Sequence, residues 1–73
     1  MEMTVKSTDK IVEVNGAPAR IWEGVSAHGI RVHAYITRVT AGRGEEHIQF
    51  QQELQEHAPA SPDTAGLPDA IEL

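Results

Sequence analysis

Four histidines, His28, His33, His47 and His57, are the residues that could bind a metal ion. Imidazole nitrogen is a common zinc ligand, and the chain has no cysteine to supply a thiolate. On a helix, His47 and His57 would lie about 15 Å apart, because each residue adds about 1.5 Å. His28 and His33 fall in an expected turn and strand, with no acid spaced to complete a tetrahedral set. The spacing therefore predicts no metal site, and nothing else in the chain predicts a cofactor.

Three short patterns could carry catalysis or hold a phosphate, and each is incomplete. Ser26 lies close to His28 in sequence, but both fall in a turn without a third residue to orient the imidazole. Glu45 and Glu46 stand side by side rather than facing each other across a substrate. The loop 42–44 (Gly-Arg-Gly) lacks the lysine and hydroxyl of a P-loop. We therefore expect a protein that is not an enzyme.

The other candidates are cationic and aromatic residues, namely Arg20, Trp22, Arg31, His33 and Tyr35. Trp, Tyr and Arg supply much of the binding energy of protein interfaces. Arginines beside stacking rings are also what some sheet proteins use to bind nucleic acid. Whether these five residues form one site depends on the strands that carry them.

The dipeptide Asn15-Gly16 stands between two runs of strand-forming residues, 10–14 and 17–23. Asn-Gly is the preferred pair for a two-residue type I′ turn, because both central residues need positive φ. We expect a tight hairpin in which Val14 pairs with Ala17.

A second turn, 26–29, precedes the run 30–37, in which apolar and polar residues alternate. The run is rich in β-branched and aromatic residues, which favour strands. A four-residue loop would pair Val25 with Ile30. The two turns together predict a three-stranded antiparallel meander.

This pairing divides the side chains between two faces of the sheet. One face would carry Val12, Val14, Ala19, Ile21, Val25, Ile30, Val32, Ala34 and Ile36, with Glu23 as its only charged residue. The opposite face would carry all five candidates, with Trp22 opposite His33 and Arg20 opposite Tyr35. We predict that this mixed face is the binding surface. The alternative is that the two rings lie beneath a terminal segment and the arginines pair with acids.

Residues 44–58 are rich in helix formers, and Pro59 ends them. The acids Glu45 and Glu46 suit the first turn of a helix. One stripe would carry His47, Phe50, Leu54 and either His57 or Ala58, so we expect this helix to cover the apolar face of the sheet. The predicted fold is α+β, a meander packed on one C-terminal helix.

Both ends of the chain lack a periodic pattern. Residues 1–9 form either an arm or the beginning of the first strand, which leaves 10–58 as the folded domain. Residues 59–73 contain three prolines, which predicts a flexible acidic tail. The last four residues, 70–73, could still dock as a short strand.

Length and charge set further limits on function. The chain has 73 residues and a net charge of −5, which fits one small domain and argues against wrapping around bulk nucleic acid. No run approaches the ~18 apolar residues of a membrane span, and no basic and apolar leader is present at the start. We expect a cytoplasmic protein without membrane contact.

Three stretches resemble proteins of one kind. They are KIVEVNGAPARIWEG (10–24), GIRVHAYITRV (29–39) and FQQELQEH (50–57), and they are similar to small uncharacterised proteins of bacteriophages and prophages. The resemblance implies a bacterial cytoplasm and an accessory role, such as binding a host protein or blocking a defence system. It brings no functional residues with it. The strand order is also similar to DNA-binding domains of the plant ethylene-response type, which are more basic on the face that contacts DNA.

The sequence thus predicts a small non-enzymatic protein-interaction module. It would bind a host protein, or form a homodimer, through the open face of the sheet. The alternative is a nucleic-acid-binding module that uses the same Arg, Trp, His and Tyr face.

Overall fold

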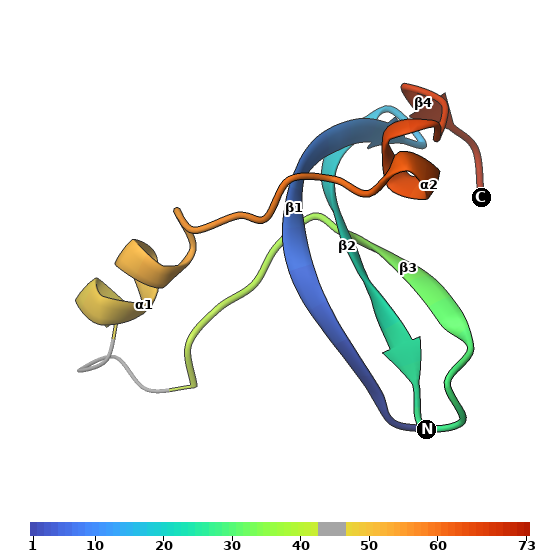
Figure 1. Cartoon of the computed structure of the whole chain (residues 1–73). Coiled ribbons are helices and arrows are strands. Elements are labelled where there is room, and N and C mark those ends of the chain that lie inside the picture. The colour runs from blue at the N-terminus through green and yellow to red at the C-terminus, as the bar shows by residue number, and fades with distance from the viewer. Residues whose placement is uncertain (43–46) are drawn as a thin grey trace.

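The sheet of this α+β protein has four strands in the order β3-β2-β1-β4 (Figure 1). The computed structural model describes residues 1–42 and 47–73. The elements are β1 (Met3–Val14), β2 (Ala17–Ser26), β3 (Arg31–Ile36), α1 (His47–Glu53), α2 (Pro62–Ala65) and β4 (Ala70–Ile71). The first three strands are antiparallel neighbours, and β4 runs parallel to β1. None of the helices in these described ranges has the length and apolar character needed to cross a lipid bilayer.

The first hairpin is confirmed. Val14 pairs with Ala17, and Asn15 and Gly16 take φ values of 52° and 85°. These left-handed conformations are what a type I′ turn requires of both central residues. Strand β1 extends back to Met3, so most of the first nine residues belong to the first strand.

Strand β1 contains a bulge at Thr8. Its pairing with β2 shifts by two residues between Ser7 and Ile11. The buried Thr8 hydroxyl donates a 2.7 Å hydrogen bond to the carbonyl oxygen of Ile21, and Arg20 Nη1 donates to the Thr8 carbonyl oxygen at 2.8 Å. The bulge is therefore closed by side-chain bonds in place of the regular ladder, and β1 curves strongly in Figure 1.

The predicted register of the second hairpin is wrong by one residue. The loop has three residues rather than four: Ser26 N donates to Ile30 O at 2.8 Å, and Gly29 N donates to Ser26 O at 3.0 Å. Gly29 has a φ of 80°, as expected for the left-handed residue that ends a three-residue hairpin loop. Trp22 therefore lies opposite Ala34 instead of opposite His33. Because side chains alternate along a strand, this one-residue shift moves every β3 side chain to the other face.

The corrected register defines two faces. The Ile21 face carries Val12, Ala19, Ile21, Glu23, Val25, Arg31, His33 and Tyr35, and the Trp22 face carries Ser7, Ile11, Arg20, Trp22, Val32, Ala34 and Ile36. The predicted apolar face and the predicted mixed face therefore do not exist as such. The Ile21 face combines the β1 and β2 residues of the predicted apolar face with the β3 residues of the predicted mixed face. The Trp22 face combines the β1 and β2 residues of the predicted mixed face with the β3 residues of the predicted apolar face.

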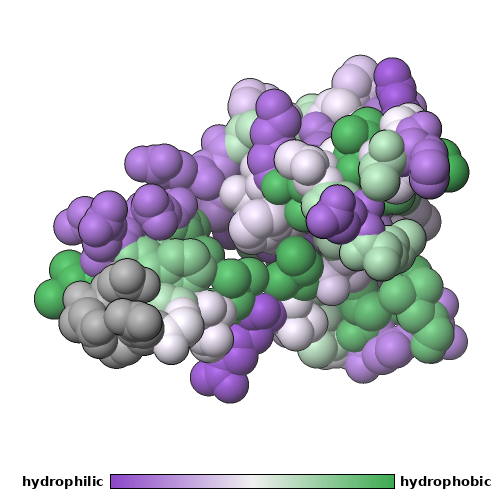
Figure 2. Space-filling model, turned by 90° about the horizontal axis from the view of Figure 1, so that it is seen from below, coloured by the Kyte–Doolittle hydropathy of each residue, from purple (hydrophilic) through white to green (hydrophobic). Residues whose placement is uncertain are grey.

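The core is small and lies on the Ile21 face. Ile21 is 0% exposed and Val12 and Ala19 are each 2% exposed, with Thr8 and Thr64 also fully buried. Thr64 belongs to α2, so α2 covers this core in place of the predicted helix. Other apolar residues stay at the surface, where Figure 2 shows hydrophobic patches separated by hydrophilic residues.

Helix α1 does not cover the sheet as predicted. It has seven residues and lies to one side of the strands in Figure 1. The expected start of this helix, with Glu45 and Glu46, lies outside the described residues, as do Arg43 and Gly44 of the glycine loop.

The C-terminal segment packs against β1, so the predicted flexible tail is wrong for these residues. Asp9 N donates to Ala58 O at 3.0 Å, and Ala58 N donates to Ser7 O at the same distance. Further along, Asn15 N donates to Ile71 O at 2.9 Å. The prediction that the last residues dock as a short strand is confirmed by β4.

Candidate functional site

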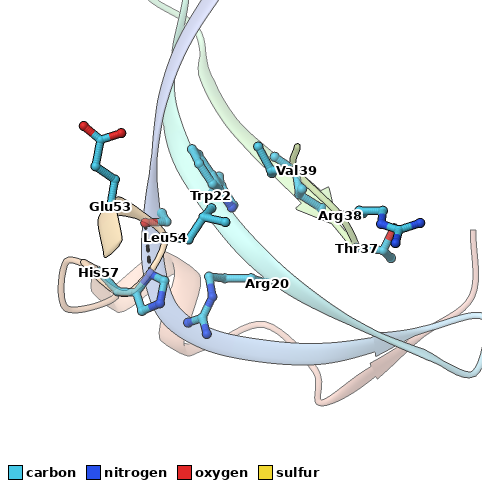
Figure 3. A pocket seen from close by; sticks show the side chains of 10 residues that line it. Arg20, Trp22, Thr37, Arg38, Val39, Glu53, Leu54 and His57 are labelled. Carbon is cyan, nitrogen blue, oxygen red and sulfur yellow. Dashed lines mark hydrogen bonds between the residues drawn. The ribbon is translucent and has the colours of Figure 1, made fainter. Parts of the chain in front are cut away.

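An open pocket of about 160 Å³ lies on the Trp22 face, and we call it the Trp22 pocket. Its apolar lining comes from Trp22 of β2, Ile36 at the end of β3, Val39, and Leu54 just after α1. Arg20 and His57 line it with polar groups. The pocket therefore joins three parts of the chain that are distant in sequence (Figure 3).

Hydrogen bonds to β1 hold the wall of the pocket that follows α1. Ser7 Oγ donates to the carbonyl oxygen of Glu56 at 3.0 Å, and Ser7 O accepts from Ala58 N at 3.0 Å. His57 Nδ1 lies 3.1 Å from Ser7 Oγ. Three successive residues are thus fixed to one position of β1, which places Leu54 and His57 beside the sheet.

The polar groups of the pocket are mainly donors. Figure 3 shows the Arg20 side chain extending towards His57, with Trp22 and Leu54 next to each other above them in this view. The carboxylate of Glu53 points away from this group, and Arg38 lies further along towards the opposite end of the pocket. An apolar floor with a guanidinium at its edge suits a ligand that has an apolar group next to an anion.

The contact between Ser7 and His57 does not have the geometry of an activated nucleophile. The hydroxyl proton of Ser7 goes to the carbonyl oxygen of Glu56, which leaves Ser7 Oγ as the acceptor towards His57 in the tautomer that carries its proton on Nδ1. A general base would need the opposite polarity, with the imidazole accepting the hydroxyl proton. The pair fixes the His57 ring and leaves its Nε2 edge for other contacts.

A second polar cluster lies on the Ile21 face, where α2 docks. Ser61 caps α2 and donates through Oγ to Glu23 Oε2 at 2.7 Å. The Thr64 hydroxyl also donates to Glu23 Oε2, and His33 Nε2 lies 3.1 Å from Thr64 Oγ1. Hydrogen bonds from Thr64 and then Ser61 hold the pKa of Glu23 below its ordinary value, with a smaller contribution from His33. The cluster fastens α2 to the sheet.

The five predicted binding residues do not form one surface. Arg20 and Trp22 line the Trp22 pocket, whereas Arg31 and His33 lie on the opposite face. Arg31 makes a 2.9 Å ion pair with Asp63 of α2. Tyr35 lies across from Ile21 and is half-buried. The alternative in which an arginine pairs with an acid therefore holds for Arg31.

Sequence reasoning missed the residues that follow α1. The helical pattern puts Leu54, with either His57 or Ala58, on a stripe, but the position of Leu54 and His57 beside Trp22 depends on the bonds between Ser7 and the segment 56–58. These bonds join backbone and small polar groups far apart in sequence. No periodicity or motif signals them.

The structure brings no three His, Cys, Asp or Glu side chains together as metal ligands would be, among those it describes. Comparisons with protein-family models, with curated proteins and with solved structures found no match. The function proposed below therefore rests on the geometry of the Trp22 pocket.

Proposed function

We propose that this protein is a small non-enzymatic protein-binding module. In this proposal the Trp22 pocket takes up an apolar side chain of a partner segment, and Arg20 binds a carboxylate next to it. The observation that carries the proposal is the convergence of Trp22, Arg20 and His57 on one open pocket of about 160 Å³.

The residue types of the pocket support protein binding. Tryptophan and arginine are the side chains that most often dominate the energy of a protein interface. Trp22 is half-buried, so part of its ring is available for contact. Leu54 and Ile36 add aliphatic surface beside it, which gives an apolar anchor site with polar groups at its edge.

Local charge supports a carboxylate as the second feature of the partner. Arginine has five N–H donors, and the bulge of β1 accepts a bond from Nη1 of Arg20. The other donors can form the paired bonds that a carboxylate accepts. The whole chain is acidic, with a net charge of −5, whereas the guanidinium of Arg20 places a positive charge at the edge of the pocket.

Two hydroxyl–imidazole contacts support a role without catalysis. In the contact of Ser7 with His57, Ser7 Oγ donates its proton to a backbone carbonyl oxygen. In the contact of Thr64 with His33, the Thr64 hydroxyl is fully buried, so no substrate reaches it.

The resemblance of the chain to small phage and prophage proteins makes bacterial host proteins the class of partner to test first. Binding or blocking such a protein would be the accessory role.

Selection from a random peptide library displayed on phage tests the proposal. We expect the wild-type protein to enrich peptides in which an aromatic or aliphatic residue stands beside Asp or Glu. Trp22→Ala and Arg20→Gln should each lose this enrichment, whereas Ile48→Ala, at an exposed position in α1, should keep it. Urea unfolding of each variant checks that the fold is retained.

Two results would contradict the proposal. One is an enriched set that is unchanged in the folded Trp22→Ala variant. The other is binding to single-stranded DNA or RNA that weakens steeply with salt, without peptide enrichment, which would support the nucleic-acid alternative.

A further inference from the structure

Strand β3 forms a free edge of the sheet. It is the terminal strand in the order, and within the described ranges residues 31–36 make no backbone hydrogen bond beyond the ladder with β2. Natural proteins usually protect such an edge with charged side chains, especially lysine, or with proline or a bulge. β3, Arg-Val-His-Ala-Tyr-Ile, has no lysine or proline and pairs regularly with β2, and its one charged residue, Arg31, forms an ion pair with Asp63 of α2.

The hydrogen-bonding groups that point outwards can be assigned from the hairpin. Ser26 N donates to Ile30 O, so Ser26 and Ile30 form a hydrogen-bonded pair. In an antiparallel ladder such pairs alternate with non-bonded pairs. Every second residue after Ile30 therefore faces β2. The N–H and C=O groups of Arg31, His33 and Tyr35 face away from the sheet.

We propose that β3 pairs antiparallel with β3 of a second copy of this chain, about a two-fold axis at His33. In this register His33 lies opposite His33 of the second copy, and Arg31 lies opposite Tyr35 of the second copy. It is the symmetric register in which all three outward-facing residues are bonded. The proposal does not depend on the Trp22 pocket having the function proposed above.

The side chains of β3 complement each other in this register. On the Trp22 face, Val32 would meet Ala34 and Ile30 would meet Ile36, so every cross-strand pair is apolar. Ile30 is 65% exposed in the single chain and would lose part of that exposure. On the Ile21 face, Arg31 would lie beside the ring of Tyr35, which is a favourable cation–π arrangement. No pair in the joint places two carboxylates opposite each other.

The two-fold axis would be perpendicular to the joined sheet. Directly opposed residues of an antiparallel pair share a face, so the Trp22 faces of both copies would lie on the same side. Both Trp22 pockets would then open in one direction. Such a dimer could hold two segments of one partner, and the second contact would gain from a high effective concentration.

Sedimentation velocity of the wild-type protein over a wide concentration range is the first test. We expect a reversible monomer–dimer equilibrium. Ile30→Lys should raise the dimer dissociation constant about tenfold or more, because an apolar pair is lost at each end of the joint and a cation is added. Ile48→Lys is the matched control, since Ile48 is 76% exposed and lies in α1, and it should leave the equilibrium unchanged.

Single cysteines test the register, because the chain has none of its own. In a hydrogen-bonded pair the Cα atoms lie about 5.5 Å apart, so His33→Cys should form a disulfide dimer under mild oxidation. Arg31→Cys should not, since the two copies of that position would lie about 14 Å apart along the strands. The variants are matched, because each loses one polar contact with α2.

A wild-type protein that stays monomeric at every concentration would overturn the proposal. Cross-linking of Arg31→Cys as fast as His33→Cys would overturn it as well. If His33→Cys fails to fold, the comparison of Ile30→Lys with Ile48→Lys still decides the question.

Discussion

Trp22 lies directly across from Ala34 in the sheet, with its side chain on the face opposite that of His33. A loop of three residues between β2 and β3 produces this pairing, and a loop of four would have reversed it. The two faces of the sheet therefore contact different parts of the chain. Trp22 and Arg20 share a pocket with the segment that follows α1, while Arg31 and His33 contact α2.

Gly29→Ala should destabilise the protein by roughly 1 to 2 kcal/mol, because a side chain at a φ of 80° is strained. In the part of the chain that the structure describes, no atom lies within 4 Å of the added Cβ, so the cost would be conformational alone. Urea unfolding measures it. Gly42 has no positive φ and no atom of the described residues near an added Cβ, so Gly42→Ala should change the free energy of unfolding little. Equal effects of the two substitutions would contradict the three-residue loop.

Thr8→Val should cost roughly 1 to 3 kcal/mol of stability, since it leaves the buried Ile21 carbonyl oxygen without the hydroxyl that bonds it. Thr8→Ser keeps the hydroxyl and should lose only about 1 kcal/mol for the missing methyl group. Thermal or urea unfolding of the three proteins checks the order. A valine variant as stable as the wild type would show that the bulge does not depend on this bond.

The cluster around Glu23 should make α2 sensitive to acid. Because the pKa of Glu23 is lowered in the folded state from its ordinary value of 4.5, the ionised carboxylate stabilises the fold above that value. This contribution is lost as the pH falls through the folded pKa. We therefore expect the stability difference between wild type and Glu23→Gln to be largest near neutral pH and to shrink in acid.

Unfolding measured from neutral to acidic pH tests this prediction. Glu72→Gln, at an exposed residue outside the cluster, is the control and should follow the wild type. The protection of the Ser61 and Thr64 amides against hydrogen exchange, relative to the intrinsic rate at each pH, should fall in acid before protection in the β1–β2 hairpin falls. A difference between wild type and Glu23→Gln that stays constant with pH would contradict the role of the carboxylate.

Local signals in the sequence predicted the first hairpin and the mixed α+β class. Asn15-Gly16 fixes its own conformation, since both residues take positive φ, and it therefore sets the Val14–Ala17 pair. The second turn is ambiguous in sequence, because a glycine at position 29 fits the end of a loop of either length. The left-handed conformation of Gly29 decides between them, and it depends on the closed ladder.

The C-terminal segment could not be predicted from hydrophobic pattern. It is held by polar contacts such as the ion pair of Lys10 with Asp69 and the bond from Ala60 N to Asp9 Oδ1. Such contacts follow no period in sequence, and the prolines favoured a tail without structure. Similar contacts place Leu54 and His57 in the lining of the Trp22 pocket, so their position was also beyond prediction.

Titration of the protein with a selected peptide, followed by Trp22 fluorescence, tests the proposed function most directly. Trp22 is the only tryptophan of the chain, so its emission reports on the pocket alone. We predict a blue shift on binding, because the peptide would exclude water from the ring, and roughly tenfold or greater weakening by Arg20→Gln through loss of charged hydrogen bonds. Binding that leaves both the emission of Trp22 and the affinity of Arg20→Gln unchanged would contradict the account.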